Sequence, residues 1–135
     1  MDKFCVSVAR RNSPDWPAND MISLYGAVQV ENKIVRAGGL RALNYEYGPN
    51  AWCIKVVEVK TGKCVGGCIF EYWNEHVDNC LSVLSAMILP EYRHTAATVQ
   101  LWRALKWFAL GCEWICTTHY KGNNTYVTKY RENKL

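Results

Sequence analysis

The clearest pattern of apolar and polar positions lies in the second half of the chain. Apolar and polar residues alternate over Trp52–Val59, and a second, mostly apolar run covers Cys64–Trp73. The short segment between them contains Gly62, which can adopt the positive φ that a hairpin turn needs. Gly66–Gly67 inside the second run predicts a bulge or a close approach of another part of the backbone. A third apolar run over Cys80–Leu89 completes a predicted antiparallel meander of three strands.

A helix is predicted to follow this meander. Pro90 cannot donate a hydrogen bond to a neighbouring strand and therefore ends the third run. Thr95 or Thr98 can cap the helix, and Gly111 can end it. Its polar residues form a narrow stripe, so we expect most of its surface to be buried on a sheet. Glu113–Tyr120 is rich in Trp, Ile, Thr and Tyr and predicts another strand, which the helix would connect to the third run in a parallel, right-handed βαβ unit.

The two ends of the chain give weaker patterns. Phe4–Ala9 alternates and predicts an opening strand, whereas the prolines, asparagines and aspartates of Asn12–Asp20 predict a loop. Met21–Val30 and Lys33–Leu43 are ambiguous between helix and strand. Near the other end, after a turn, Thr125–Glu132 is interpreted as a last short helix.

The composition is consistent with one domain. A chain of 135 residues can bury a substantial core without metal or disulfide support. Half of its residues are apolar, and six Trp and eight Tyr argue against a disordered chain. We expect a single domain over 1–135, with a poorly defined part over 1–50 and the core over 51–135. The fold class is α/β: an antiparallel meander followed by a βαβ unit, in a mixed, splayed sheet with helices on both faces.

Charge and cysteine usage exclude several functional classes. The net charge of +4 is modest, and nucleic-acid binding usually needs a denser basic face. A CoA-type anion, an acidic partner and ordinary solubility explain the charge equally well. The seven cysteines lack the Cys-x-x-Cys spacing of metal sites, so we expect no metal and free thiols in a reducing compartment. No apolar run reaches the ~20 residues that span a bilayer, and no signal-peptide pattern is present. We therefore expect a cytoplasmic location.

The segment around Pro90 resembles the GNAT family of acetyltransferases. Leu84–Arg93, with the sequence LSAMILPEYR, resembles the fourth strand of that family and its V-x-P-x-Y-R ending. The next residues stand where the family has its R/Q-x-x-G-x-G/A turn, although Ala96 and Thr98 occupy the glycine or small-residue positions. The resemblance implies that the strand backbone pairs with the pantetheine arm of acetyl-CoA and that the turn holds its pyrophosphate. The implied residues are Met87, Ile88 and Leu89 for the strand, and Arg93, His94, Thr95, Ala96, Ala97 and Thr98 for the turn.

A second resemblance lies near the end of the chain. Asn123 followed seven residues later by Tyr130 resembles the family's N-x-x-A-x-x-L-Y helix. It implies that Asn123 belongs to the acetyl-CoA site and that Tyr130 protonates the departing thiolate, although a packing role for Tyr130 is the alternative. Glu71 is a candidate general base, with Glu113 a second candidate, and a solvated strand-face carboxylate is the alternative for both. The family's last two strands are expected to be missing, which would leave an open sheet edge.

Two functions follow from these resemblances. The first is an N-acetyltransferase that moves an acetyl group from acetyl-CoA to an amine. The second is a non-catalytic GNAT-fold interaction or assembly protein, such as a phage virion component or a host-factor inhibitor, which would bind a protein or a second copy through the open edge. The glycine-poor turn and the missing strands favour the second function. The Pro-Glu-Tyr-Arg junction and the spacing of Asn123 and Tyr130 favour the first.

Overall fold

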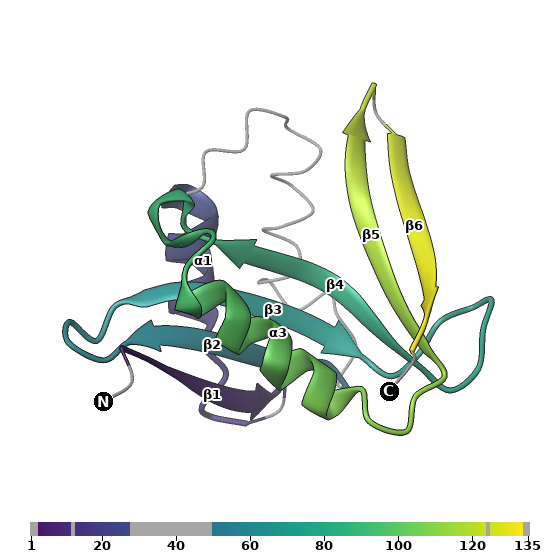
Figure 1. The fold of residues 1–135 in the computed structure, drawn as a ribbon, viewed down its shortest axis with the longest axis horizontal. Helices are drawn as coiled ribbons and strands as arrows, with labels where there is room; N and C mark the ends of the chain where they lie inside the picture. Colours follow the sequence, from purple (N-terminus) through teal and green to yellow (C-terminus); the bar gives the residue numbers. More distant parts are fainter. Residues whose placement is uncertain (1–2, 12, 28–49, 124, 134–135) are drawn as a thin grey trace.

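The strands of the chain form one mixed sheet with helices on its two faces (Figure 1). The computed structural model describes residues 3–11, 13–27, 50–123 and 125–133. Within them, the six-stranded sheet has the order β1-β2-β3-β4-β5-β6. The strands are β1 (Phe4–Arg10), β2 (Trp52–Glu58), β3 (Cys64–Glu71), β4 (Cys80–Ile88), β5 (Trp114–Gly122) and β6 (Thr125–Glu132). The helices are α1 (Ala18–Ala27), α3 (Ala96–Phe108) and the short 3-10 helix η1 (Pro90–Tyr92).

The pairing of the strands confirms the meander and the βαβ unit. β1 to β4 pair antiparallel in sequence order, β4 and β5 pair parallel through the α3 crossover, and β5 and β6 pair antiparallel. On one face, Phe108 of α3 contacts the rings of Trp52 and Phe70. On the other face, Lys55 of β2 forms a salt bridge of 3.0 Å with Asp20 of α1. Helices therefore cover both faces, as predicted.

Gly67 allows α1 to lie directly on the sheet. A Cβ atom at this position would lie 2.7 Å from Sδ of Met21, well inside van der Waals contact. Met21 is fully buried, so its side chain has little room to move away. Next to it, a register shift between Val56 and Val57 marks a bulge opposite the Gly66 region. Both parts of the prediction at Gly66–Gly67 are confirmed: a bulge lies beside Gly66, and Met21 of α1 approaches Gly67 closely.

The prediction of a helix over Thr125–Glu132 is wrong. These residues form β6, which pairs with β5 along its whole length. Thr, Tyr and Val are strand-forming residues, and the hairpin turn is made by Gly122 and Asn123, whose φ values are 88° and 51°. The sheet therefore continues beyond β5 by one antiparallel strand.

The remaining elements agree with the sequence to within a few residues. The opening strand is confirmed as β1, while α1 begins at Ala18, inside the expected loop. That helix resolves the ambiguity over Met21–Val30 as far as Ala27, whereas Lys33–Leu43 lies outside the described residues. Thr95 is the residue that caps α3, because its side chain accepts a hydrogen bond from the Ala97 N–H at 3.2 Å.

Candidate functional site

β4 and β5 pair only over their first residues and then separate. Cys80–Val83 pairs with Trp114–Thr117. Beyond these residues β4 continues to Ile88 and β5 to Gly122, but the two strands no longer pair with each other. Figure 1 shows the two strands diverging into a V. A bulge begins the divergence, because Ile69 of β3 pairs with Ser85 and Phe70 pairs with Val83, which leaves Leu84 without a partner.

Beyond the bulge, one side of β4 is left without a neighbouring strand. The Leu89 N–H donates to the Val65 carbonyl of the β3 side at 2.9 Å. Because backbone groups alternate in direction along a strand, those of Met87 also face β3 and those of Ile88 face the gap. The Ile88 carbonyl accepts a hydrogen bond from Nε of Arg93 at 3.1 Å. Of the three residues that the resemblance implies for pantetheine, Ile88 is thus the one whose backbone faces the open side.

The turn after β4 leads directly into the start of α3. The left-handed residue of this turn is His94, with φ of 62°, and Ala96 is the first residue of the helix. An alanine at position 96 is therefore unstrained, because glycine is favoured only at positive φ. Within the described part of the chain, the backbone N–H groups of His94, Thr95 and Ala96 make no hydrogen bond.

These free N–H groups and the exposed Arg93 suit an anion. A helix start carries partial positive charge and unpaired donors, which together bind phosphate groups. The Thr98 hydroxyl contributes nothing to this surface, because its Oγ1 is buried without a hydrogen-bond partner among the described residues. An anion at this turn would therefore meet backbone groups and Arg93 rather than the Thr98 hydroxyl.

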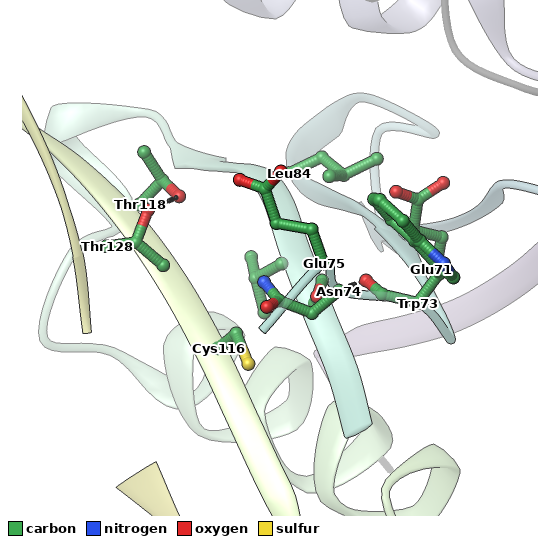
Figure 2. Close-up of a pocket in the computed structure, with 10 residues that line it drawn as sticks. Glu71, Trp73, Asn74, Glu75, Leu84, Cys116, Thr118 and Thr128 are labelled. Atoms are coloured by element: carbon green, nitrogen blue, oxygen red, sulfur yellow. Dashed lines mark hydrogen bonds between the residues drawn. The ribbon is translucent and has the colours of Figure 1, made fainter. Parts of the chain in front are cut away.

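A cavity of about 150 Å³ lies where β4 and β5 begin to separate. One wall is formed by Cys116, Thr118 and Thr128 of β5 and β6, and the opposite wall by Glu71, Trp73 and Glu75 of β3 and the segment that follows it. Figure 2 shows the side chain of Glu75 extending into the space between these walls. The floor is β4 at Ser82, Val83 and Leu84, so the cavity includes the bulge.

Glu71 is the member of this cavity that sequence reasoning identified. It pairs with Ser82, which in turn pairs with Cys116, so the three side chains share one face of the sheet. Glu71 is half-buried, and burial raises the pKa of its carboxyl above the ordinary value because a charged carboxylate is poorly solvated there. A carboxylate that takes a proton more readily is suited to general-base chemistry.

The other cavity residues were missed by sequence reasoning. Trp73 ends the apolar run Cys64–Trp73 and Glu75 lies in the polar segment after it, although both follow the end of β3 in the structure. Ser82 and Cys116 lie inside strands that look purely structural. The Ser82 hydroxyl donates to the Trp73 carbonyl at 2.6 Å and so holds this turn against the start of β4. Cys116 is buried, and burial raises the pKa of its thiol, which agrees with a core thiol rather than a nucleophile. These residues line one cavity because β4 and β5 separate there and leave a space between them.

The remaining predicted residues lie apart from the turn at Arg93. Asn123 is in the hairpin turn at the free end of β5 and β6, on the other arm of the V (Figure 1). Tyr130 of β6 pairs with Cys116 of β5, and its ring centroid lies 6.2 Å from that of His76. Tyr130 is not among the residues that line the cavity. Glu113 precedes β5 at the closed end, where its N–H donates to the Asn79 carbonyl at 2.7 Å. The roles of these residues stay predictions.

Two further features concern membranes and metals. Among the described helices, none is long and apolar enough to cross a membrane. Over the same residues, no three His, Cys, Asp or Glu side chains come together in a group that could hold a metal ion.

Comparison with known proteins identifies the fold. No family model matches the chain, and no curated protein matches its sequence. Among solved structures, an acetyltransferase of the GNAT family from Staphylococcus aureus Mu50 is 8% identical, with a TM-score of 0.64, and the match covers 96% of this chain and 100% of that one.

Two further matches contain bound ligands. An aminoglycoside acetyltransferase from an uncultured soil metagenomic sample, in complex with sisomicin, is 14% identical with a TM-score of 0.61, over 90% of this chain and 81% of that one. AAC(6')-Iy, in complex with the bisubstrate analogue CoA-S-monomethyl-acetylneamine, is 13% identical with a TM-score of 0.56, over 88% and 82%. The strand order, the parallel β4–β5 pair and these matches together show that the chain has the GNAT fold.

Proposed function

We propose that this chain is an N-acetyltransferase that transfers an acetyl group from acetyl-CoA to an amine. The observation that carries this proposal is the separation of β4 from β5 after Val83 and Thr117. It leaves one side of β4 unpaired, with a positively polarised helix start at one end and a cavity containing carboxylates at the other. The structural neighbours that bind sisomicin or a CoA bisubstrate analogue support a CoA-dependent reaction on an amine.

The proposed acetyl-CoA site uses the turn and β4. Arg93 and the free N–H groups of His94, Thr95 and Ala96 would hold the pyrophosphate, and the outward backbone of Ile88 would pair with the pantetheine arm. Acetyl-CoA supplies the acetyl group as an activated thioester. The chain would hold that thioester next to the amine, and correct positioning removes much of the entropic barrier of a two-molecule reaction.

Glu71 is the proposed general base. An amine attacks only after it has lost its extra proton, and Glu71 lies in the cavity beside the bulge where it can take that proton. As the new C–N bond forms and the C–S bond breaks, the departing sulfur gains a proton. Tyr130 is the candidate donor, since a phenol holds its proton at neutral pH. A Tyr130 that acts in this way would have to reach the gap from β6.

The described residues do not favour the non-catalytic alternative. One argument for it was a truncated sheet, but β6 extends the sheet beyond β5. The other was a strained, glycine-poor turn, but the left-handed position belongs to His94 rather than Ala96. No further observation on the described residues favours a purely structural role.

Acetyl-CoA binding tests the proposal directly. A ligand present at 100 times its Kd stabilises the folded state by about 2.7 kcal/mol, so millimolar acetyl-CoA should raise the melting temperature by several degrees. Release of free CoA thiol in the presence of an amine panel would then establish transfer. No thermal shift at millimolar acetyl-CoA, together with no heat of binding by calorimetry, would overturn the proposal.

A further inference from the structure

The cavity at the fork of β4 and β5 is acidic, although the chain as a whole is basic. Among the described residues that line it, the charged ones are Glu71 and Glu75 and none is a lysine or arginine, whereas the net charge of the chain is +4. The exposed indole of Trp73 lies between these two carboxylates in sequence and lines the same cavity. An aromatic face next to carboxylates is a favourable environment for an organic cation.

The position of Trp73 is fixed by the sheet rather than by the turn alone. Its carbonyl accepts the 2.6 Å hydrogen bond from the Ser82 hydroxyl, and Ser82 is itself buried at the start of β4. Yet Trp73 remains 63% exposed as a residue. A large apolar ring that is anchored by its backbone and left open to a cavity is available to contact a ligand.

The two carboxylates cannot both serve the amine that reacts. The attacking amine must be neutral, so the group facing Glu71 loses its positive charge before the C–N bond forms. Glu75 and the ring of Trp73 gain nothing from a neutral group, because both ion pairing and cation–π attraction require a charge. Glu75 is exposed, and the polar contact that its carboxylate makes among the described residues is with Nε2 of His76 at 3.1 Å, so the carboxylate is accessible to a ligand.

We propose that Trp73 and Glu75 bind a second ammonium group of the acceptor, so that the acceptor is an amine with at least two positive charges. This inference rests on the proposed function, since it assigns the reacting amine to Glu71. A cavity of about 150 Å³ is comparable to one that encloses a benzene-sized group, which is enough for the end of a short alkylammonium chain.

Calorimetric titration of the full chain with three small ligands of equal length tests the proposal. The ligands are 1,5-diaminopentane, 5-aminopentan-1-ol and 1,5-pentanediol, which carry two, one and no ammonium groups. We expect the diamine to bind at least about tenfold more tightly than the amino alcohol, and the diol not to bind. A peptide with blocked ends and two adjacent lysines, titrated in parallel, shows whether a free amine or a peptide side chain is the preferred source of the two charges.

Variants assign the effect to the cavity. Trp73→Leu should weaken diamine binding by about threefold to thirtyfold, the range expected for cation–π contacts. Trp107→Leu is the matched control, because Trp107 is similarly exposed at 66% but lies on α3, over the other face of the sheet, and should leave binding unchanged. Glu75→Gln should weaken binding and reduce its dependence on salt, while Glu91→Gln in η1 should do neither.

The outcomes separate this inference from the proposed function. Equal affinity for the diamine and the amino alcohol, or equal loss in the Trp73 and Trp107 variants, overturns the second-ammonium site even if acetyl-CoA binds. Preferential diamine binding that depends on Trp73 supports the site, even in a chain that shows no thermal shift with acetyl-CoA. In that case only the transferase proposal fails.

Discussion

Nε of Arg93 donates a hydrogen bond to the Ile88 carbonyl at 3.1 Å and so occupies an acceptor that β4 presents to the open side of the sheet. The same guanidinium is the cation next to the unpaired N–H groups at the start of α3. A pantetheine arm that pairs with β4 would compete with Arg93 for this carbonyl, while a pyrophosphate would draw the guanidinium towards the turn. Arg93 therefore lies where both parts of acetyl-CoA are proposed to bind.

Arg93→Ala should weaken acetyl-CoA binding by roughly tenfold or more, because charge-assisted hydrogen bonds to phosphate are about twice as strong as neutral ones. The dissociation constant is measured by calorimetry at two salt concentrations. Arg103→Ala on the exposed side of α3 serves as the control and should change it little. Unchanged affinity in the Arg93 variant would remove the turn from the proposed site.

Glu71→Gln should lower kcat by about 100-fold or more, the usual contribution of a general base. Burial raises the pKa of Glu71 above its ordinary value of 4.5, so kcat/KM of the wild-type chain should rise with pH through that raised pKa. In the Gln variant this rise should be absent. Glu113→Gln, outside the cavity, should keep both the rate and the pH profile.

The same raised pKa has an effect on stability with a defined sign. The folded state holds the Glu71 proton more tightly than the unfolded state does, so its contribution to stability is present below pH 4.5 and is lost as pH rises through the raised pKa. Glu71→Gln should therefore melt at a higher temperature than wild type at neutral pH. Below pH 4.5 the two melting temperatures should converge, and a variant that is less stable at neutral pH would contradict this.

Tyr130→Phe tests the acid role that is proposed for this residue. If Tyr130 protonates the leaving thiolate, the variant should lose roughly 100-fold in kcat with an unchanged KM for acetyl-CoA. Tyr126→Phe, four residues earlier on the same edge strand, is the matched control. Full activity in the Tyr130 variant would leave solvent as the proton source.

Thr95→Ala should destabilise the chain by about 1 kcal/mol, because it removes the side-chain cap of α3. Thr95→Ser retains the hydroxyl oxygen that accepts the Ala97 N–H and should be close to wild type. Urea unfolding of both variants measures the difference. Equal destabilisation of the Ala and Ser variants would mean that the methyl group, rather than the cap, is responsible.

The core strands and α3 could be predicted because their signals are local. Alternation, turn glycines and Pro90 fix the strand boundaries within a few residues, and Thr95 marks the helix start. At Thr125–Glu132 the spacing of Asn123 and Tyr130 resembles a helix of the family, but local preference decides the structure. The Gly122–Asn123 turn and the β-branched and aromatic residues after it already favoured a hairpin.

The cavity could be predicted only in part because it has no local signal. Glu71 was found through its place beside β4, but Trp73, Glu75 and Cys116 come together only through the Leu84 bulge and the separation of β5. A bulge depends on the pairing of two strands, and the hydrophobic pattern of Cys80–Leu89 does not record which residue is left without a partner. The register of three strands was needed to locate this site.

The short parallel contact between β4 and β5 can also act as a hinge between the β5–β6 hairpin and the rest of the sheet. Four residue pairs join the β5–β6 hairpin to the rest of the sheet, and Nδ2 of Asn133 fastens its base to the Ala109 and Cys112 carbonyls at 2.9 and 3.0 Å. The β5–β6 hairpin is thus attached to the sheet at one end only. A change in the angle between β4 and β5 would be concentrated at the four pairs that join them. A molecule bound between β4 and β5 would restrict the motion of the β5–β6 hairpin. Amide hydrogen exchange in this hairpin should therefore slow when acetyl-CoA is added.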